Sequence, residues 1–227
     1  NPELKTCFIF NQLTNLRRMD FDETISILNH YSKKKLKGKI AHEEIAPFRA
    51  NYTNLDPSSP KIAAVLVLLY PVINKSHFVL IERTKYKGQH SGQISFPGGK
   101  KEKKDKDIVE TALREAWEET NIKKDEITII GELSKLYIPP SNFEVTPILA
   151  FSKHQPDFIP NKREVVDVIE VKIEDLIKPQ TIKKMKIKFK NGKVLNTPCF
   201  DFHSKTVWGA TAMILNELKH YLLDSKK

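Results

Sequence analysis

Apolar residues recur along the chain with two different periods, which separate helical stretches from extended ones. Phe21, Ile25 and Leu28 lie three and four residues apart, the spacing of one face of a helix. The spacing predicts a helix over 21–35, and Gly38, after a run of lysines, provides a stop. A second helix is predicted over 208–223, with an apolar stripe formed by Ala212, Leu215, Leu218 and Leu222.

Between these helices, short apolar runs bounded by turn residues predict strands. The runs over 61–72 and 77–84 are separated by the four residues Ile-Asn-Lys-Ser, which indicates a hairpin. Asn191-Gly192 lies between alternating residues and predicts a second hairpin. Further extended pieces are expected at 92–99, 126–138, 143–152 and 164–173. Because strands outnumber helices, we expect an α+β sandwich with helices on both sides of a sheet.

The domain boundary is predicted from a change in composition. The stretch 49–61 is rich in Asn, Ser and Pro, as linkers are. We therefore expect an N-terminal helical extension and linker over 1–60 and the main domain over 61–227.

Composition excludes several classes of protein. The 227 residues are 40% hydrophobic and 29% charged, enough apolar residues for a core. The longest apolar run, 62–73, is too short to cross a bilayer, so no membrane association is expected. Two distant cysteines indicate neither a disulfide framework nor a zinc site and fit a reducing, intracellular setting.

The formal net charge of +10 favours anionic ligands. Nucleic acid is not expected as a partner, because no aromatic and basic residues alternate in the pattern that stacks bases. Lysines scattered over the surface would give the same charge, so the net charge only slightly favours a phosphate-rich ligand.

The stretch Ala112–Ile122, ALREAWEETNI, gathers three glutamates and one arginine. Residues three and four apart share a helix face, so Glu115, Glu118 and Glu119 project together and repel one another by roughly 0.2–0.5 kcal/mol per pair. The glycine-rich segment SFPGGK precedes them and can expose backbone oxygens. Carboxylate and backbone oxygens together suit Mg²⁺ or Mn²⁺ meeting the phosphates of a substrate.

These residues resemble the signature of the Nudix hydrolases, in which Arg-Glu is followed after two residues by Glu-Glu. The core is intact as Arg114, Glu115, Glu118 and Glu119. The general signature has a glutamate eight residues before the arginine, where this chain has Lys106. The spacing from the glycine to the arginine is one residue longer in this chain than in the general signature. A later glycine is replaced by Asn121, a mild exchange because Asn tolerates the left-handed conformation. The resemblance implies a Nudix-type α/β/α sandwich with a mixed sheet.

The segment upstream is similar to the motif of one branch, the coenzyme A diphosphatases. Where that branch has a basic residue, this chain has Gly88 beside Lys87. The resemblance implies cleavage of coenzyme A or its acyl derivatives to 3′,5′-ADP and (acyl-)phosphopantetheine. The alternative is another nucleoside diphosphate derivative: ADP-ribose, a dinucleoside polyphosphate or an oxidised nucleotide. The matching residues are Arg83, Thr84, His90, Gly92, Gln93, Phe96, Pro97, Gly98 and Gly99.

The resemblance also implies roles for individual residues. Glu115, Glu119 and a backbone carbonyl near Gly98 or Gly99 are expected to hold Mg²⁺ or Mn²⁺. Glu118 is expected to share a metal or act as base, with Arg114 holding its carboxylate. The expected substrate contacts are Arg83, His90, Gln93 and Gly98, and the catalytic set is Glu118, Arg114 and Glu115.

Four further points concern the base, Trp117, a role in binding alone, and the location. Glu144 and Glu164 are further candidates for the base, although each fits a surface position better than a catalytic one. Trp117 is expected to pack against the domain, on a helix face other than that of the glutamates. A Nudix fold can also serve only in binding, but that would predict loss of a metal glutamate, and none is lost here. The resemblance admits a peroxisomal or mitochondrial location, with no targeting signal visible.

Overall fold

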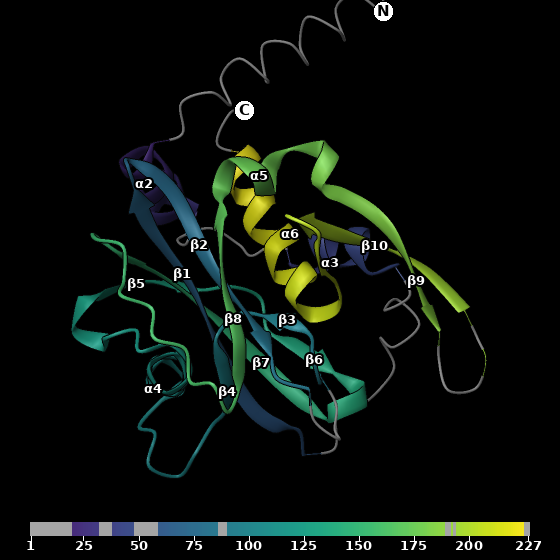
Figure 1. The fold of residues 1–227 in the computed structure, drawn as a ribbon, viewed down its shortest axis with the longest axis horizontal. Helices are drawn as coiled ribbons and strands as arrows, with labels where there is room; N and C mark the ends of the chain where they lie inside the picture. Colours follow the sequence, from purple (N-terminus) through teal and green to yellow (C-terminus); the bar gives the residue numbers. More distant parts are fainter. Residues whose placement is uncertain are drawn as a thin grey trace, which may run out of the picture.

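A computed structural model describes residues 20–31, 38–47, 59–85, 90–188, 192 and 194–224. At its centre is a mixed sheet with the strand order β3-β2-β1-β7-β5 (Figure 1). Strand β4 also pairs with β1, β6 with β7, and β8 with β2. The strands of this sheet are β1 (Lys61–Val72), β2 (Lys75–Arg83), β3 (Ile94–Ser95), β4 (Gly98–Lys100), β5 (Ile127–Glu132), β6 (Leu136–Ile138), β7 (Phe143–Ser152) and β8 (Val165–Lys172).

Strand directions follow from the connections. Strands β1 and β2 are antiparallel and joined by the predicted hairpin, whose Ile73 and Asn74 both have positive φ, 48° and 61°. Two positive φ values in succession match the twist of the flanking strands. Strands β1 and β7 are parallel, and the long crossover between them contains α4 (Ile108–Thr120). The sheet is therefore mixed, as expected.

Alternate residues of β1 face two separate apolar cores. Leu66 and Leu68 belong to the cluster that includes Ala112 and Ala116 of α4. Val67 and Leu69 belong to the other cluster, with α6 (Gly209–Asp224). Because side chains alternate across a strand, one buried strand serves both faces. In Figure 1, α4 and α6 cover opposite faces of the sheet, which confirms the sandwich with helices on both sides.

The N-terminal helices extend the α6 side of the fold. Phe21 and Leu28 of α2 (Phe21–Tyr31) enter the same core as α6, and α3 (Gly38–Ile45) packs along α6. Gly38 opens α3 rather than ending the first helix, which is a difference from the expectation. A Cβ at Gly38 would lie 2.2 Å from the Cβ of Ser134, so the glycine permits a close approach between two segments. The division at residue 60 stays a prediction.

Beyond α6 lies a three-stranded antiparallel sheet in the order β11-β10-β9. The pairing of β9 with β10 confirms the second hairpin, although Asn191 in its turn lies outside the described residues. No helix in the described ranges is long and apolar enough to cross a membrane. The remaining elements are β9 (Ile182–Lys188), β10 (Val194–Phe202), β11 (Lys205–Val207), α5 (Ile173–Ile177) and the short 3₁₀ turns η3 (Lys124–Glu126), η4 (Pro139–Ser141) and η5 (Pro179–Thr181).

Candidate active site

The glutamates are carried by α4, whose two ends are fixed by side-chain and backbone caps. Asp107 is the N-cap, and its carboxylate accepts a hydrogen bond of 2.8 Å from the backbone N–H of Glu110. Asn121 ends the helix at φ 63° and ψ 19°, and its N–H donates to the carbonyl of Trp117. The left-handed conformation expected of Asn121 is confirmed.

The glycines of β4 allow this strand to lie tightly between β1 and α4. A Cβ at Gly98 would lie 2.3 Å from the carbonyl oxygen of Ala64, an impossible contact with backbone. A Cβ at Gly99 would lie 2.5 Å from Cδ and Oε2 of Glu115. Gly98 therefore lets β4 lie close to the backbone of β1, and Gly99 lets the carboxylate of Glu115 lie close to β4.

Glu119 is the most enclosed of the three glutamates, with 1% of its surface exposed. Its Oε1 accepts a hydrogen bond of 2.7 Å from Nη1 of Arg83, and its Oε2 accepts one of 2.8 Å from the N–H of Gly98. Burial raises the pKa of Glu119 to about 7, against the opposing effects of Arg83 and the Gly98 N–H, and the charge of Glu115 adds to the rise.

Glu115 lies against Gly99 and is mostly buried. Burial raises its pKa, the Arg114 guanidinium opposes the shift, and the charges of Glu118 and Glu164 add to it. Glu164 thus acts electrostatically on this glutamate, whereas Glu144 lies in β7 opposite Tyr137 of β6. A cation beside Glu115 and Glu119 would relieve the cost of their buried charge.

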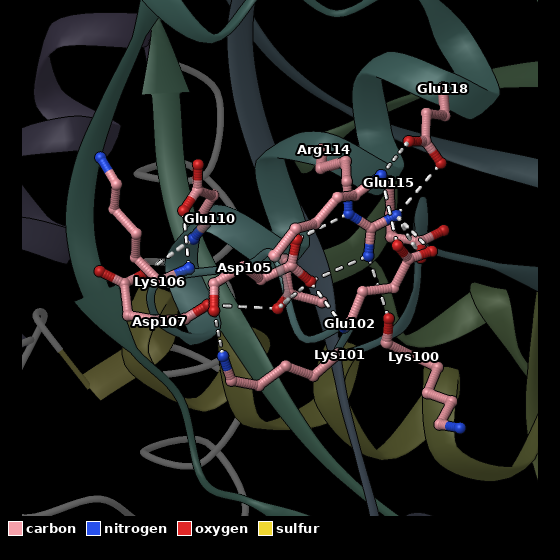
Figure 2. Close-up of polar contacts among 12 residues, drawn as sticks. Lys100, Lys101, Glu102, Asp105, Lys106, Asp107, Glu110, Arg114, Glu115 and Glu118 are labelled. Carbon is pink, nitrogen blue, oxygen red and sulfur yellow. Dashed lines mark hydrogen bonds and ion pairs between the residues drawn. The ribbon is translucent and has the colours of Figure 1, made fainter.

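Arg114 is the centre of a polar network on the next face of α4 (Figure 2). Its Nε and Nη2 donate to the two carboxylate oxygens of Asp105, at 2.8 and 3.0 Å. Its Nη1 donates to Glu115 at 2.9 Å and to Glu118 at 3.1 Å. The expected contact with Glu118 is confirmed, but the bidentate partner is Asp105, whose side chain is almost fully buried.

The role of Asp105 was missed in the sequence. Beyond the ion pair it accepts hydrogen bonds from the N–H of Glu102 and the hydroxyl of Thr111. The hydrogen bond from Arg114 is the main reason that the pKa of Asp105 lies well below its ordinary value. The acidic partner of Arg114 is therefore Asp105, nine residues before it. The general signature has its glutamate eight residues before the arginine, where this chain has Lys106. The extra residue in the glycine-to-arginine spacing was the signal that could have located it.

The upstream motif reaches the same site through Arg83. The backbone N–H of Arg83 donates to the carbonyl of Gln93, so the residue that binds Glu119 is tied to the turn that holds His90. His90 lies at φ 64°, with Nδ1 3.0 Å from Oε1 of Gln93 and Nε2 3.3 Å from Oγ of Ser141. The His90–Ser141 contact was not anticipated, and Lys87 and Gly88 lie outside the described residues.

All nine predicted site residues therefore form one connected set. Arg83 and the N–H of Gly98 each donate a hydrogen bond to Glu119. Gly99 lies against Glu115, and Arg114 donates hydrogen bonds to both Glu115 and Glu118. The members of the set are Arg83, His90, Gln93, Gly98, Gly99, Arg114, Glu115, Glu118 and Glu119. The expectation for Trp117 is wrong: 56% of its surface is exposed, because it lies on the side of α4 that faces away from the sheet.

The donors near Gly99 suit a hard divalent cation. They are carboxylate oxygens of Glu115 and Glu119 with the backbone of a glycine strand, and oxygen is the ligand that Mg²⁺ and Mn²⁺ prefer. Within the described part of the chain, no group of three or more His, Cys, Asp or Glu side chains is already arranged around one point. Glu119 is engaged by Arg83 and Gly98, so metal ligation would require these contacts to be shared or exchanged.

Comparison with known proteins identifies the class. Residues 60–191 match the family model described as the NUDIX domain, and the chain therefore belongs to the Nudix hydrolase family. Members act on nucleoside diphosphate derivatives and generally use divalent metal ions.

Individual relatives agree with this assignment. The chain is 33% identical over 164 residues to an uncharacterized Nudix hydrolase NudL of Pectobacterium atrosepticum, covering 71% of this chain and 83% of that protein. It is 31% identical over 158 residues to a NudL protein of Yersinia enterocolitica, covering 69% and 78%. A crystal structure of a MutT/nudix family protein from Enterococcus faecalis is similar in fold, with a TM-score of 0.51, 15% identity and coverage of 85% of this chain and 76% of that one.

Proposed function

We propose that this Nudix hydrolase cleaves the diphosphate of coenzyme A or its acyl derivatives, releasing 3′,5′-ADP and (acyl-)phosphopantetheine. The observation that supports this most directly is the bond between Arg83 and Glu119. It joins the upstream motif, which resembles that of coenzyme A diphosphatases, to the catalytic helix. The His90–Gln93 turn is attached to the same arginine by its backbone.

In this proposal, the roles divide by burial and partner. Glu115 and Glu119 hold the divalent ion with the backbone carbonyl at Gly98 or Gly99. A bound Mg²⁺ or Mn²⁺ would supply positive charge to offset that of the phosphate oxygens and would make the attacking water more acidic. Arg114 keeps the carboxylates of Glu115 and Glu118 in place through its contacts at 2.9 and 3.1 Å.

The substrate contacts come from the upstream motif. In the structure, the guanidinium of Arg83 and the N–H of Gly98 donate hydrogen bonds to Glu119. A cationic donor and a backbone donor would equally suit an oxygen of the substrate diphosphate. His90 and Gln93 lie on the adjoining turn and would meet the nucleotide portion of the substrate. The 3′-phosphate of coenzyme A adds a further anionic group for a chain with a net charge of +10.

Glu118 and Glu164 are the two candidates for the base that the geometry favours. Glu118 is bonded to Arg114 and remains partly exposed to water. Glu164 lies in a segment tied to the end of α4 by the backbone hydrogen bond from Asn161 to Glu119, and its charge contributes to the raised pKa of Glu115. Glu118→Gln and Glu164→Gln, compared by their pH–rate profiles at saturating Mg²⁺, separate the two: with protonation of Glu119 no longer limiting metal binding, only loss of the base should remove the acidic limb of the profile.

The test of the proposed substrate is a panel of nucleotides with Mg²⁺ and with Mn²⁺, with products identified by mass. Coenzyme A and an acyl derivative should be preferred over ADP-ribose, diadenosine polyphosphate and oxidised nucleotides. The products should have the masses of 3′,5′-ADP and phosphopantetheine. A clear preference for ADP-ribose, with Glu119→Gln inactive on it, would leave a Nudix hydrolase and refute the coenzyme A assignment.

A further inference from the structure

A groove of about 610 Å³ runs along the outer side of α4, away from the sheet. Its floor is an apolar stripe of Val109, Leu113 and Trp117, spaced four residues apart on one helix face. Trp117 is the large aromatic residue of this stripe and is 56% exposed. A volume of this size is within the range of small-ligand sites, roughly 300–1,000 Å³.

The groove is separate from the site of the glutamates. At 3.6 residues per turn, Trp117 and Glu119 point in directions about 160° apart around the helix. Glu119 is buried against β4, and Trp117 faces solvent. The two sites share one wall, because Arg114 and Asp105 line the groove while Arg114 also holds Glu115.

Lysines surround the apolar floor. Lys104 and Lys106 come from the segment before α4, and Lys123 and Lys124 from the segment after it. Lys104 forms long ion pairs with Glu102 and Glu118, and Lys123 with Glu126. Among the described residues no ion pair engages Lys106 or Lys124, and Figure 2 shows Lys106 extending away from the Arg114 network.

The acidic residues of the groove are already engaged by the protein. Both carboxylate oxygens of Asp105 accept hydrogen bonds from one edge of the Arg114 guanidinium, formed by Nε and Nη2. Asp107 caps α4, and Glu110 accepts a hydrogen bond of 2.7 Å from the N–H of Lys106. Both lie at the helix N-terminus, where the helix dipole offsets part of their charge. The unengaged charge on the rim is therefore mainly that of the lysines, with Asp125 as the exposed exception.

We propose that this groove binds a phosphorylated small molecule with a flat aromatic ring, of which a nucleoside diphosphate is the simplest example. The ring would stack on Trp117, and the phosphates would be met by Lys106 and Lys124. A single exposed aromatic residue fits one base rather than a strand of nucleic acid, which uses several. In a two-fold pairing of two copies, the lysines would face one another and repel. The site goes beyond the proposed reaction and does not depend on which substrate is cleaved.

The test uses the fluorescence of Trp117 and ADP as the probe, without divalent metal. The chain has two tryptophans, so Trp208→Phe leaves Trp117 as the reporter. ADP should quench it along a saturable curve, while adenosine and pyrophosphate, each offering half of the contacts, should bind roughly tenfold or more weakly. The double variant Lys106→Gln/Lys124→Gln should weaken ADP binding by a similar factor. Lys184→Gln, an exposed lysine on β9, is the matched control and should leave it unchanged.

Two further variants distinguish ADP binding in the groove from ADP binding at the glutamates. Arg83→Gln, which alters the face of the glutamates, should leave the ADP curve unchanged. Trp117→Phe in the otherwise native chain should remove the ADP-dependent quenching and weaken binding measured by calorimetry, which covers the case in which Trp208→Phe does not fold. The proposal is overturned by an absence of saturable quenching, by equal effects of Lys184→Gln and the double variant, or by loss of the signal in Arg83→Gln. Tighter quenching by a single-stranded RNA oligomer than by ADP would also overturn it, in favour of a nucleic-acid surface.

Discussion

Replacing Asp105 by Asn removes one partner of the best-formed buried ion pair near the active site. Asp105 gives Arg114 two charge-assisted hydrogen bonds, and its side chain is 1% exposed. Breaking a buried pair by removing one partner costs roughly 3–5 kcal/mol. Arg114 keeps Glu115 and Glu118, so we expect the lower end, about 3 kcal/mol. For a domain of this size that lowers Tm by about 6–12 °C.

Urea unfolding and thermal melts followed by circular dichroism measure this loss. The matched control is Asp107→Asn, two residues away and exposed, which should change stability by no more than about 0.5 kcal/mol because Asn is as good an N-cap as Asp. Equal losses for the two variants would refute the assignment of Asp105 as the partner of Arg114.

The same variant has a pH signature. The pKa of Asp105 is lowered in the folded protein, chiefly by Arg114, from an unfolded value of about 3.9. Its stabilising contribution is therefore complete above about pH 5 and is lost as the pH falls through the unfolded and then the folded pKa. The difference between wild type and Asp105→Asn should be full at pH 7 and shrink steadily below about pH 5. A difference that stays constant into acid would contradict the ion-pair origin of the effect.

The remaining predictions concern the glycine strand and the metal. Gly98→Ala should destabilise strongly in urea unfolding, because its Cβ meets the backbone at Ala64, whereas Gly99→Ala meets only the movable carboxyl of Glu115 and should mainly lower kcat; the reverse order would contradict the packing. Glu119→Gln should keep its circular dichroism spectrum and lose at least ~100-fold in metal-dependent hydrolysis, since even outer-shell changes cost 10–100-fold; retained activity would exclude it as a ligand. With a pKa raised to about 7, Glu119 must lose its proton to ligate, so Mn²⁺ affinity in calorimetry should rise from pH 6 to 8, and a flat profile would count against this role.

The sequence predicted the parts of the site that lie close together along the chain. Arg114, Glu115, Glu118 and Glu119 all lie in α4. Because a helix turns once every 3.6 residues, their spacing brings residues of successive turns next to one another. The first hairpin and the left-handed Asn121 follow from turn chemistry over a few residues. Such features depend on local backbone preferences, which the residues themselves determine.

Only the tertiary structure decided which charged groups meet. The hydrogen bond from Arg83 to Glu119 spans 36 residues and exists because α4 packs on the sheet in which β2 ends at Arg83. The choice of Asp105 as the partner of Arg114 depends on the path of the loop between β4 and α4, which periodicity does not describe. Trp117 shows the limit most clearly: its hydrophobicity favoured burial, yet among the described residues no element covers that side of α4, and the ring is 56% exposed in a groove that it lines together with lysines.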